Sequence, residues 1–181
     1  KRLYATFLLA AILGLRRSDI ANLQFGNIDW EHNTISLVQE KTKKRVNLPL
    51  VKEVGNALID YLRNERKNDC TNNYVFLTMK PPYQKISVDT LYLGFQTAIW
   101  ASGVNVERRH HGMHTMRHSL ATHLLKDEQS LPMIAEVLGH SSSNSTKLYL
   151  RVDLDGLKKC LLPIPPVPLT FYEQKGGIFY E

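Results

Sequence analysis

The hydrophobic pattern of the chain is mostly helical. Residues 2–13 are almost entirely apolar and predict a helix that ends at Gly14. Ser18 then has the side chain of an N-cap, and it predicts a second, short helix that reaches Leu23. Apolar residues at helical spacing predict further helices over residues 51–66, 88–101, 115–125, 131–138, 145–150 and 154–162.

Short runs of β-forming residues interrupt the helical pattern. Residues 34–39 and 45–50 flank a polar stretch rich in lysine, which predicts a β-hairpin with a basic tip. Residues 74–77 predict a third strand, followed by a loop at Pro81-Pro82. The predicted fold class is therefore mainly α with a small three-stranded antiparallel β-sheet (α+β).

Length and composition place the chain among globular domains. Its 181 residues suit one domain, and 43% hydrophobic residues are enough for a core. No apolar run reaches 18 residues, and Cys70 and Cys160 cannot form a disulfide framework, so we expect a cytoplasmic protein with no membrane partner. The chain begins with Lys1-Arg2 rather than methionine, which predicts a fragment of something longer.

The charge of the chain is unevenly distributed. The formal net charge is +6, and residues 151–181 hold four basic and four acidic side chains, so the whole surplus precedes residue 151. A basic body of this kind favours a polyanionic partner, with nucleic acid first and an acidic membrane second.

Six of the seven histidines lie between His110 and His140, which raises the possibility of a metal site. His114 and His118 have the spacing of a zinc pair on a helix, but Arg117 lies between them and no carboxylate is near. The spacing also lets His114 and Arg117 face one ligand, and arginine provides a fixed fork of donors for phosphate oxygens.

Two other segments allow both a structural and a functional interpretation. In the sequence GLRRSD, Arg16 could cap the carbonyls of the preceding helix or bind a phosphate beside the next helix. In LGHSSSNSTKLYL, Tyr149 taken alone would be a core residue.

Four motifs in this order resemble the tyrosine recombinase (phage integrase) family over about residues 3–162. They are GLRRSD, EKTKKRVNLPL, HTMRHSLATHLL and LGHSSSNSTKLYL. Asp19 and Met116 stand where the family usually has Glu and Leu. The resemblance implies the tyrosine recombinase catalytic-domain fold and a catalytic set of Arg16, Lys41, His114, Arg117, His140 and Tyr149, with Tyr149 as the nucleophile.

The resemblance implies site-specific DNA recombination through a 3′-phosphotyrosyl intermediate, without metal, cofactor or ATP. The expected partner is double-stranded DNA, bound by a homotetramer on two DNA sites, while this fragment alone would be a monomer; accessory directionality factors would fit such a system. Further DNA contacts are expected from Lys43, Lys44, Arg45, Arg108 and Arg109.

The expected domain organisation is a catalytic domain over residues 1–162, without the amino-terminal core-binding domain of the family. Residues 163–181 are a Pro-rich, aromatic tail that would suit exchange between protomers. Integration or excision of a mobile element is the preferred role. The alternatives are Xer-like dimer resolution, relaxation of DNA by a type IB topoisomerase-like enzyme, a DNA-binding module without catalysis, and a metal-dependent hydrolase.

Overall fold

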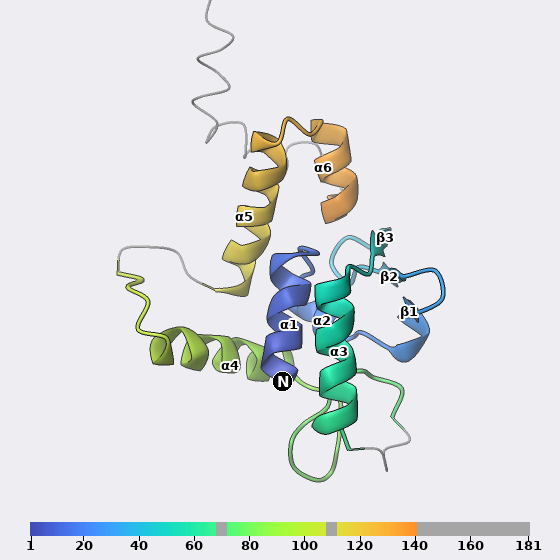
Figure 1. Cartoon of the computed structure of the whole chain (residues 1–181), viewed down its shortest axis with the longest axis vertical. Helices are drawn as coiled ribbons and strands as arrows, with labels where there is room; N and C mark the ends of the chain where they lie inside the picture. The colour runs from blue at the N-terminus through green and yellow to red at the C-terminus, as the bar shows by residue number, and fades with distance from the viewer. Residues whose placement is uncertain (68–71, 108–111, 141–181) are drawn as a thin grey trace, which may run out of the picture.

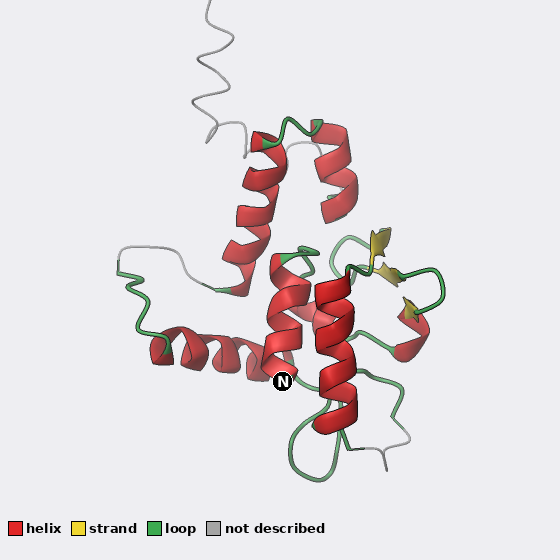
Figure 2. Cartoon of the chain, viewed as in Figure 1, coloured by secondary structure: helices red, strands yellow, loops and turns green. Residues whose placement is uncertain are grey.

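The computed structural model describes residues 1–67, 72–107 and 112–140 (Figure 1). The predicted helices over residues 145–150 and 154–162 and the tail over residues 163–181 lie outside this part. The helices are α1 Arg2–Ala11, α2 Arg17–Ala21, α3 Lys52–Asn64, α4 Val88–Ala101, α5 Met113–Lys126 and α6 Leu131–Leu138, with a 3₁₀ turn at Phe25–Asn27. The strands are β1 Ile28–Asp29, β2 Thr34–Val38 and β3 Arg45–Pro49. The described fold is mainly helical with one small sheet, as predicted (Figure 2).

The sheet confirms the predicted hairpin. Its strand order is β1-β2-β3, and both pairs are antiparallel. Ile35 pairs with Leu48 and Leu37 with Val46, and all four side chains are buried. Because side chains alternate between the two faces of a strand, this register turns one face of the hairpin toward the core and leaves the other in solvent.

The third strand is not where the sequence predicted it. Residues 74–77 form only isolated bridges, from Tyr74 to Gln24 and from Leu77 to Lys85, and the third strand is β1. The segment is apolar because Val75 and Phe76 are fully buried in the main core. The backbone of this segment forms a hydrogen bond to a loop instead: the Val75 amide donates to the Leu23 carbonyl over 2.8 Å.

Helix α1 lies at the centre of the fold and contacts α3, α4 and α5 (Figure 1). Its buried face is rich in small side chains, including Ala5 and Ala10, which allow the neighbouring helices to approach closely. A second, smaller apolar cluster of Ala121, Ile134 and Leu138 joins α5 to α6.

The turn from α1 to α2 differs in detail from the prediction. Helix α1 ends at Ala11, and α2 begins at Arg17 with Arg16 rather than Ser18 as its N-cap. Gly14 has φ +63°, and a Cβ there would lie 2.9 Å from side-chain carbons of Leu120 and Leu138. Glycine therefore lets this turn fit against α5 and α6.

Candidate active site

Four separate segments of the chain meet at one end of α1. They are the Gly14–Arg16 turn, the end of β2 at Gln39, the first half of α5, and the carboxyl end of α6. Hydrogen bonds between their side chains and carbonyls connect all four. The three motifs that contain Arg16, Arg117 and His140 are thereby brought together.

Arg117 is held by two backbone carbonyls. Its side chain is 3% exposed on α5; Nη1 donates to the Gly14 carbonyl over 2.6 Å and Nη2 donates to the Leu138 carbonyl. These acceptors belong to the turn after α1 and the end of α6. The guanidinium plane of Arg117 is therefore fixed by two other parts of the fold.

Gln39 links Arg16 to the carbonyl that holds Arg117. Arg16, in the extended conformation at the N-cap of α2, donates from Nη1 to Oε1 of Gln39. Nε2 of Gln39 donates over 3.0 Å to the Leu138 carbonyl, which also accepts from Arg117. Gln39 was not among the predicted site residues, because a glutamine at the end of a strand before a polar turn is usually exposed.

The tip of the hairpin is tied to the same network. The amide of Gln39 donates to the Lys44 carbonyl over 2.8 Å, and the amide of Lys43 donates to the Gln39 carbonyl over 2.9 Å. Lys44 Nζ donates over 2.6 Å to the His140 carbonyl at the end of α6. Lys41 lies on the turn between these residues and is exposed.

His140 follows Gly139, which ends α6 in the left-handed conformation with φ +62°. The side chain of His140 is 8% exposed. Burial, together with the charges of Arg117 and Arg16, lowers the pKa of His140 to about 4. The imidazole is therefore neutral at pH 7 and donates through one ring nitrogen only.

His114 lies in the first turn of α5. Partial burial, followed by the charges of His118, Arg117 and Arg16, lowers its pKa below the usual value. The rings of His114 and His118 meet edge to face with centroids 5.2 Å apart. His114 is thus also biased toward the neutral form, in which one ring nitrogen can accept a proton.

Asp19 connects α2 with the hairpin. Its carboxyl group is buried and accepts the Glu40 amide over 2.9 Å. Burial raises the pKa of Asp19, against the opposing effects of the Glu40 amide and the Arg16 charge. The side chain therefore fixes the first residue of the hairpin tip relative to Arg16.

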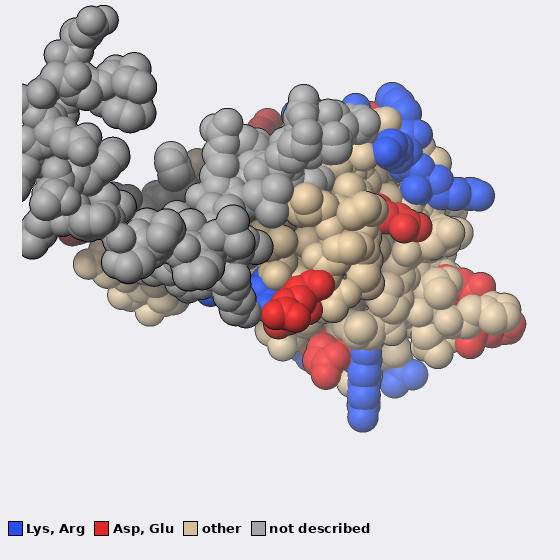
Figure 3. All heavy atoms as spheres, turned by 90° about the horizontal axis from the view of Figure 1, so that it is seen from above, with Lys and Arg blue, Asp and Glu red and all other residues tan. Residues whose placement is uncertain are grey.

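The structure describes only some of the remaining predicted residues. Lys43 and Arg45 are exposed on the hairpin. Figure 3 shows lysine and arginine side chains gathered at the upper right of that view of the molecule. Lys44, predicted as a DNA contact, has its ammonium on the His140 carbonyl. Tyr149, Arg108 and Arg109 lie outside the described residues.

Residues 1–67, 72–107 and 112–140 hold no group of three His, Cys, Asp or Glu side chains that could bind a metal ion. In the same ranges, no helix combines the length and the apolar character needed to cross a bilayer.

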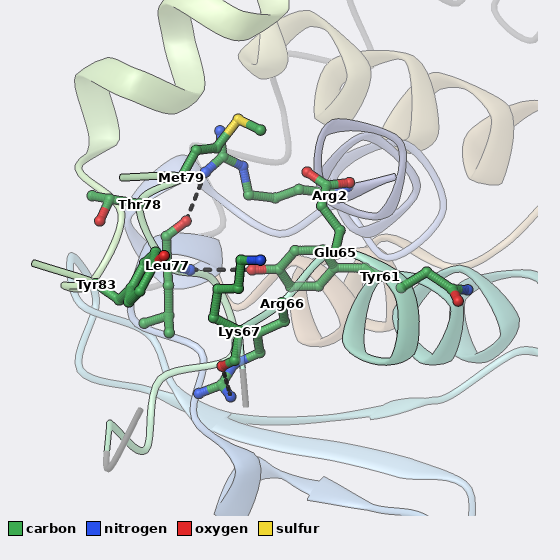
Figure 4. A pocket seen from close by; sticks show the side chains of 10 residues that line it. Arg2, Tyr61, Glu65, Arg66, Lys67, Leu77, Thr78, Met79 and Tyr83 are labelled. Atoms are coloured by element: carbon green, nitrogen blue, oxygen red, sulfur yellow. Dashed lines mark hydrogen bonds between the residues drawn. The ribbon is translucent and has the colours of Figure 1, made fainter. Parts of the chain in front are cut away.

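A pocket near the start of the chain uses different residues (Figure 4). Arg2 Nη1 donates over 2.6 Å to the Leu77 carbonyl, and the Tyr61 hydroxyl accepts the Leu77 amide over 3.3 Å. Of the candidate catalytic residues that the structure describes, none lines this pocket. Its polar groups anchor the backbone of Leu77 to α1 and α3.

The low pKa of His140 predicts a loss of stability in acid. In the unfolded chain His140 has a pKa near 6.5 and binds a proton below it, whereas in the folded state it stays neutral until the pH approaches 4. The free energy of unfolding should therefore fall as the pH drops through this window. Between pH 7 and pH 4.5 the loss attributable to His140 is about 2 kcal/mol. Urea unfolding of wild type and of His140→Gln at both pH values isolates the contribution of His140, because acidic groups contribute equally to both proteins. Equal losses in the two proteins would contradict the assignment.

The chain is similar to known proteins over most of its length. Residues 1–155 match the Phage integrase family. An integrase/recombinase relative from Sinorhizobium fredii, y4gC, is 35% identical over 162 residues, which cover 90% of this chain and 82% of that protein. The chain covers only 38% and 39% of two further integrase/recombinase relatives from the same organism, y4rF and y4rA.

Solved structures share the fold. The crystal structure of XerA recombinase has a TM-score of 0.73 at 23% identity, with 88% of this chain and 56% of that one covered. XerH site-specific recombinase, bound to a palindromic difH substrate in a post-cleavage complex, has a TM-score of 0.68 at 24% identity, with 87% and 45% covered. This chain thus spans about half the length of those proteins.

Proposed function

The chain belongs to the phage integrase family of tyrosine recombinases, and from this membership we propose that it is a site-specific recombinase that cleaves and rejoins duplex DNA. The observation that carries the proposal is the chain of hydrogen bonds that links Arg16, through Gln39 and the Leu138 carbonyl, to Arg117. It fixes two guanidinium groups from separate motifs in one place, and such planar forks match the oxygens of a phosphodiester. The DNA-bound XerH structure supports a DNA substrate.

Arg16, Arg117 and His140 would stabilise the transition state. Negative charge grows on the non-bridging oxygens of the phosphate, and two fixed guanidinium groups meet that charge without a metal ion. His140, neutral at pH 7 because its pKa is about 4, would add a hydrogen bond without adding charge. Because two backbone carbonyls already hold Arg117, little reorganisation is needed during the reaction.

Tyr149 would be the nucleophile. Its phenolic oxygen bonds to phosphorus while the bond from phosphorus to the 5′-oxygen breaks. His114 accepts the phenolic proton, and the Lys41 ammonium gives a proton to the leaving 5′-oxygen. The resulting 3′-phosphotyrosyl ester keeps the energy of the phosphodiester, so the 5′-hydroxyl of a second duplex can attack it without ATP.

The biological setting belongs to the same proposal. Integration or excision of a mobile element in the bacterial cytoplasm is the favoured role, and Xer-like dimer resolution is the alternative. The active assembly would be a homotetramer that holds two duplex sites. The exposed cations Lys41, Lys43 and Arg45 would follow the DNA backbone.

Strand exchange tests this function. We expect the protein to join strands between two linear duplexes that carry its site, and EDTA to leave the yield unchanged. Relaxation of supercoiled plasmid without exchange would instead indicate a topoisomerase. Loss of cleavage in EDTA would indicate a metal-dependent hydrolase, and DNA binding without cleavage a binding module.

Replacing Lys41 with Ala should slow cleavage of an ordinary phosphodiester about 100-fold or more, because the leaving 5′-oxygen loses its proton donor. A duplex with sulfur at the 5′-bridging position should be cleaved at nearly the wild-type rate, since a thiolate leaves without a proton. The measurement is the single-turnover rate on both substrates.

Lys43→Ala is the matched control, because it removes the same charge two residues along the exposed hairpin. It should weaken DNA binding and leave the ratio of the two rates unchanged. If sulfur fails to restore cleavage by Lys41→Ala, another residue is the proton donor.

A further inference from the structure

Gln39 is a polar residue in an unusually buried position. Its exposed fraction is 0%, although it lies where β2 gives way to the hairpin turn. The amide group makes three hydrogen bonds, each to a different partner: Oε1 accepts from Arg16 Nη1 and from Thr42 Oγ1, and Nε2 donates to the Leu138 carbonyl. Burial of a polar group is favourable only when such partners are present.

The orientation of this amide is fixed by its partners. If the amide were rotated by half a turn, its NH₂ group would face the donors of Arg16 and Thr42, and its oxygen would face the Leu138 carbonyl. Gly139 provides the necessary space, because a Cβ there would overlap the terminal atoms of the Gln39 side chain. Two segments 100 residues apart in the chain are therefore fitted to each other around one amide.

The backbone of Gln39 also shapes the turn that carries Lys41. Its amide donates to the Lys44 carbonyl, and its carbonyl accepts from the Lys43 amide. The side chain adds the bond from Thr42, the residue next to Lys41. A displacement of the turn would move Gln39 and disturb its bonds to Arg16 and Leu138.

We propose that Gln39 is a positioning residue that couples the hairpin tip bearing Lys41 to Arg16 and to the Leu138 carbonyl that holds Arg117. The inference rests on the proposed recombinase function. Because Gln39 is fully buried, it would act through Arg16, Thr42 and Leu138 and not on the DNA directly. It places the proton donor of the leaving group and the phosphate-binding arginines in one arrangement, so that both act in the same step.

Two variants separate the parts of this role. Gln39→Met keeps the length of the side chain and removes all three hydrogen bonds. Gln39→Glu keeps an acceptor for Arg16 and Thr42 but directs an oxygen at the Leu138 carbonyl. Val54→Ala is the control, because it removes buried atoms from the main core on α3 and lowers stability without touching the network.

The first measurement is a double-mutant cycle on single-turnover cleavage. Gln39→Met should slow cleavage about 10- to 100-fold with DNA affinity nearly unchanged, because misplaced groups lose rate rather than binding. In the Lys41→Ala background, the fold reduction in cleavage rate caused by the same substitution should be at least about threefold smaller, because no proton donor is left to be positioned. Gln39→Glu should lie between wild type and Gln39→Met.

The second measurement is hydrogen exchange at the amides of residues 41–44. Gln39→Met should speed exchange there about tenfold relative to wild type, whereas Val54→Ala should not single out the hairpin. The proposal is overturned if Gln39→Met cleaves like Val54→Ala, or if its cost is undiminished in the Lys41→Ala background. Absence of cleavage by wild type would overturn the recombinase function instead, and hydrogen exchange would still decide whether Gln39 holds the tip.

Discussion

Tyr149→Phe should abolish strand cleavage and covalent attachment to DNA, with a fall in rate of about 10,000-fold or more. The substitution removes the single oxygen that would bond to phosphorus and keeps the aromatic ring. Groups that bind the DNA backbone are unchanged, so affinity for duplex DNA should stay within about twofold of wild type. Cleavage is measured on a nicked duplex that traps the intermediate, and affinity by fluorescence anisotropy.

Tyr92→Phe provides the matched control. Tyr92 lies on α4 with its ring beside Arg17, and this ring contact survives loss of the hydroxyl. The control should cleave like wild type. If Tyr149→Phe cleaves normally, the nucleophile is a different residue. If Tyr149→Phe also loses DNA binding, Tyr149 has a structural role.

Arg117→Ala should slow cleavage about 100- to 1,000-fold, as expected for loss of one preorganised group that meets transition-state charge. It should also lower the free energy of unfolding by about 1–3 kcal/mol, because the Gly14 carbonyl loses a buried hydrogen bond. Rates are therefore compared under conditions in which urea titration shows both proteins to be fully folded.

Two controls distinguish the electrostatic role of Arg117 from its role in folding. Arg117→Lys keeps the charge but cannot reach two carbonyls at once, so it should fall between Ala and wild type. A methylphosphonate substrate, which lacks one charged oxygen, should reduce the penalty of Arg117→Ala. A folded Arg117→Ala protein with a wild-type cleavage rate would contradict the assignment.

Local pattern was sufficient to predict most of the described fold. The hairpin follows from period-two burial on two short strands, and α3 and α6 follow from apolar stripes with helical spacing. Local pattern failed to predict the third strand, because a buried apolar segment need not pair as a strand. Residues 74–77 are apolar because they fill the core, whereas the two-residue strand β1 is too short to leave a signature.

The candidate site was predictable only to the level of its motifs. Arg16, Arg117 and His140 stand out in the sequence because each lies in a recognisable segment, and the structure brings their segments together. Gln39 has no such signal, because its burial depends on the Leu138 carbonyl and on Gly139, which are distant in the chain. The engagement of Lys44 by the His140 carbonyl likewise depends on the docking of the hairpin against α6.

The most direct test of the tyrosine mechanism is chemical identification of the covalent link. The chain would be incubated with a library of nicked, randomised duplexes, and adducts that survive SDS would be digested and analysed by mass spectrometry and sequencing. We predict a peptide whose Tyr149 carries a nucleotide 3′-phosphate, together with a preferred DNA sequence. DNA binding without any adduct, or an adduct on a residue other than Tyr149, would contradict the account.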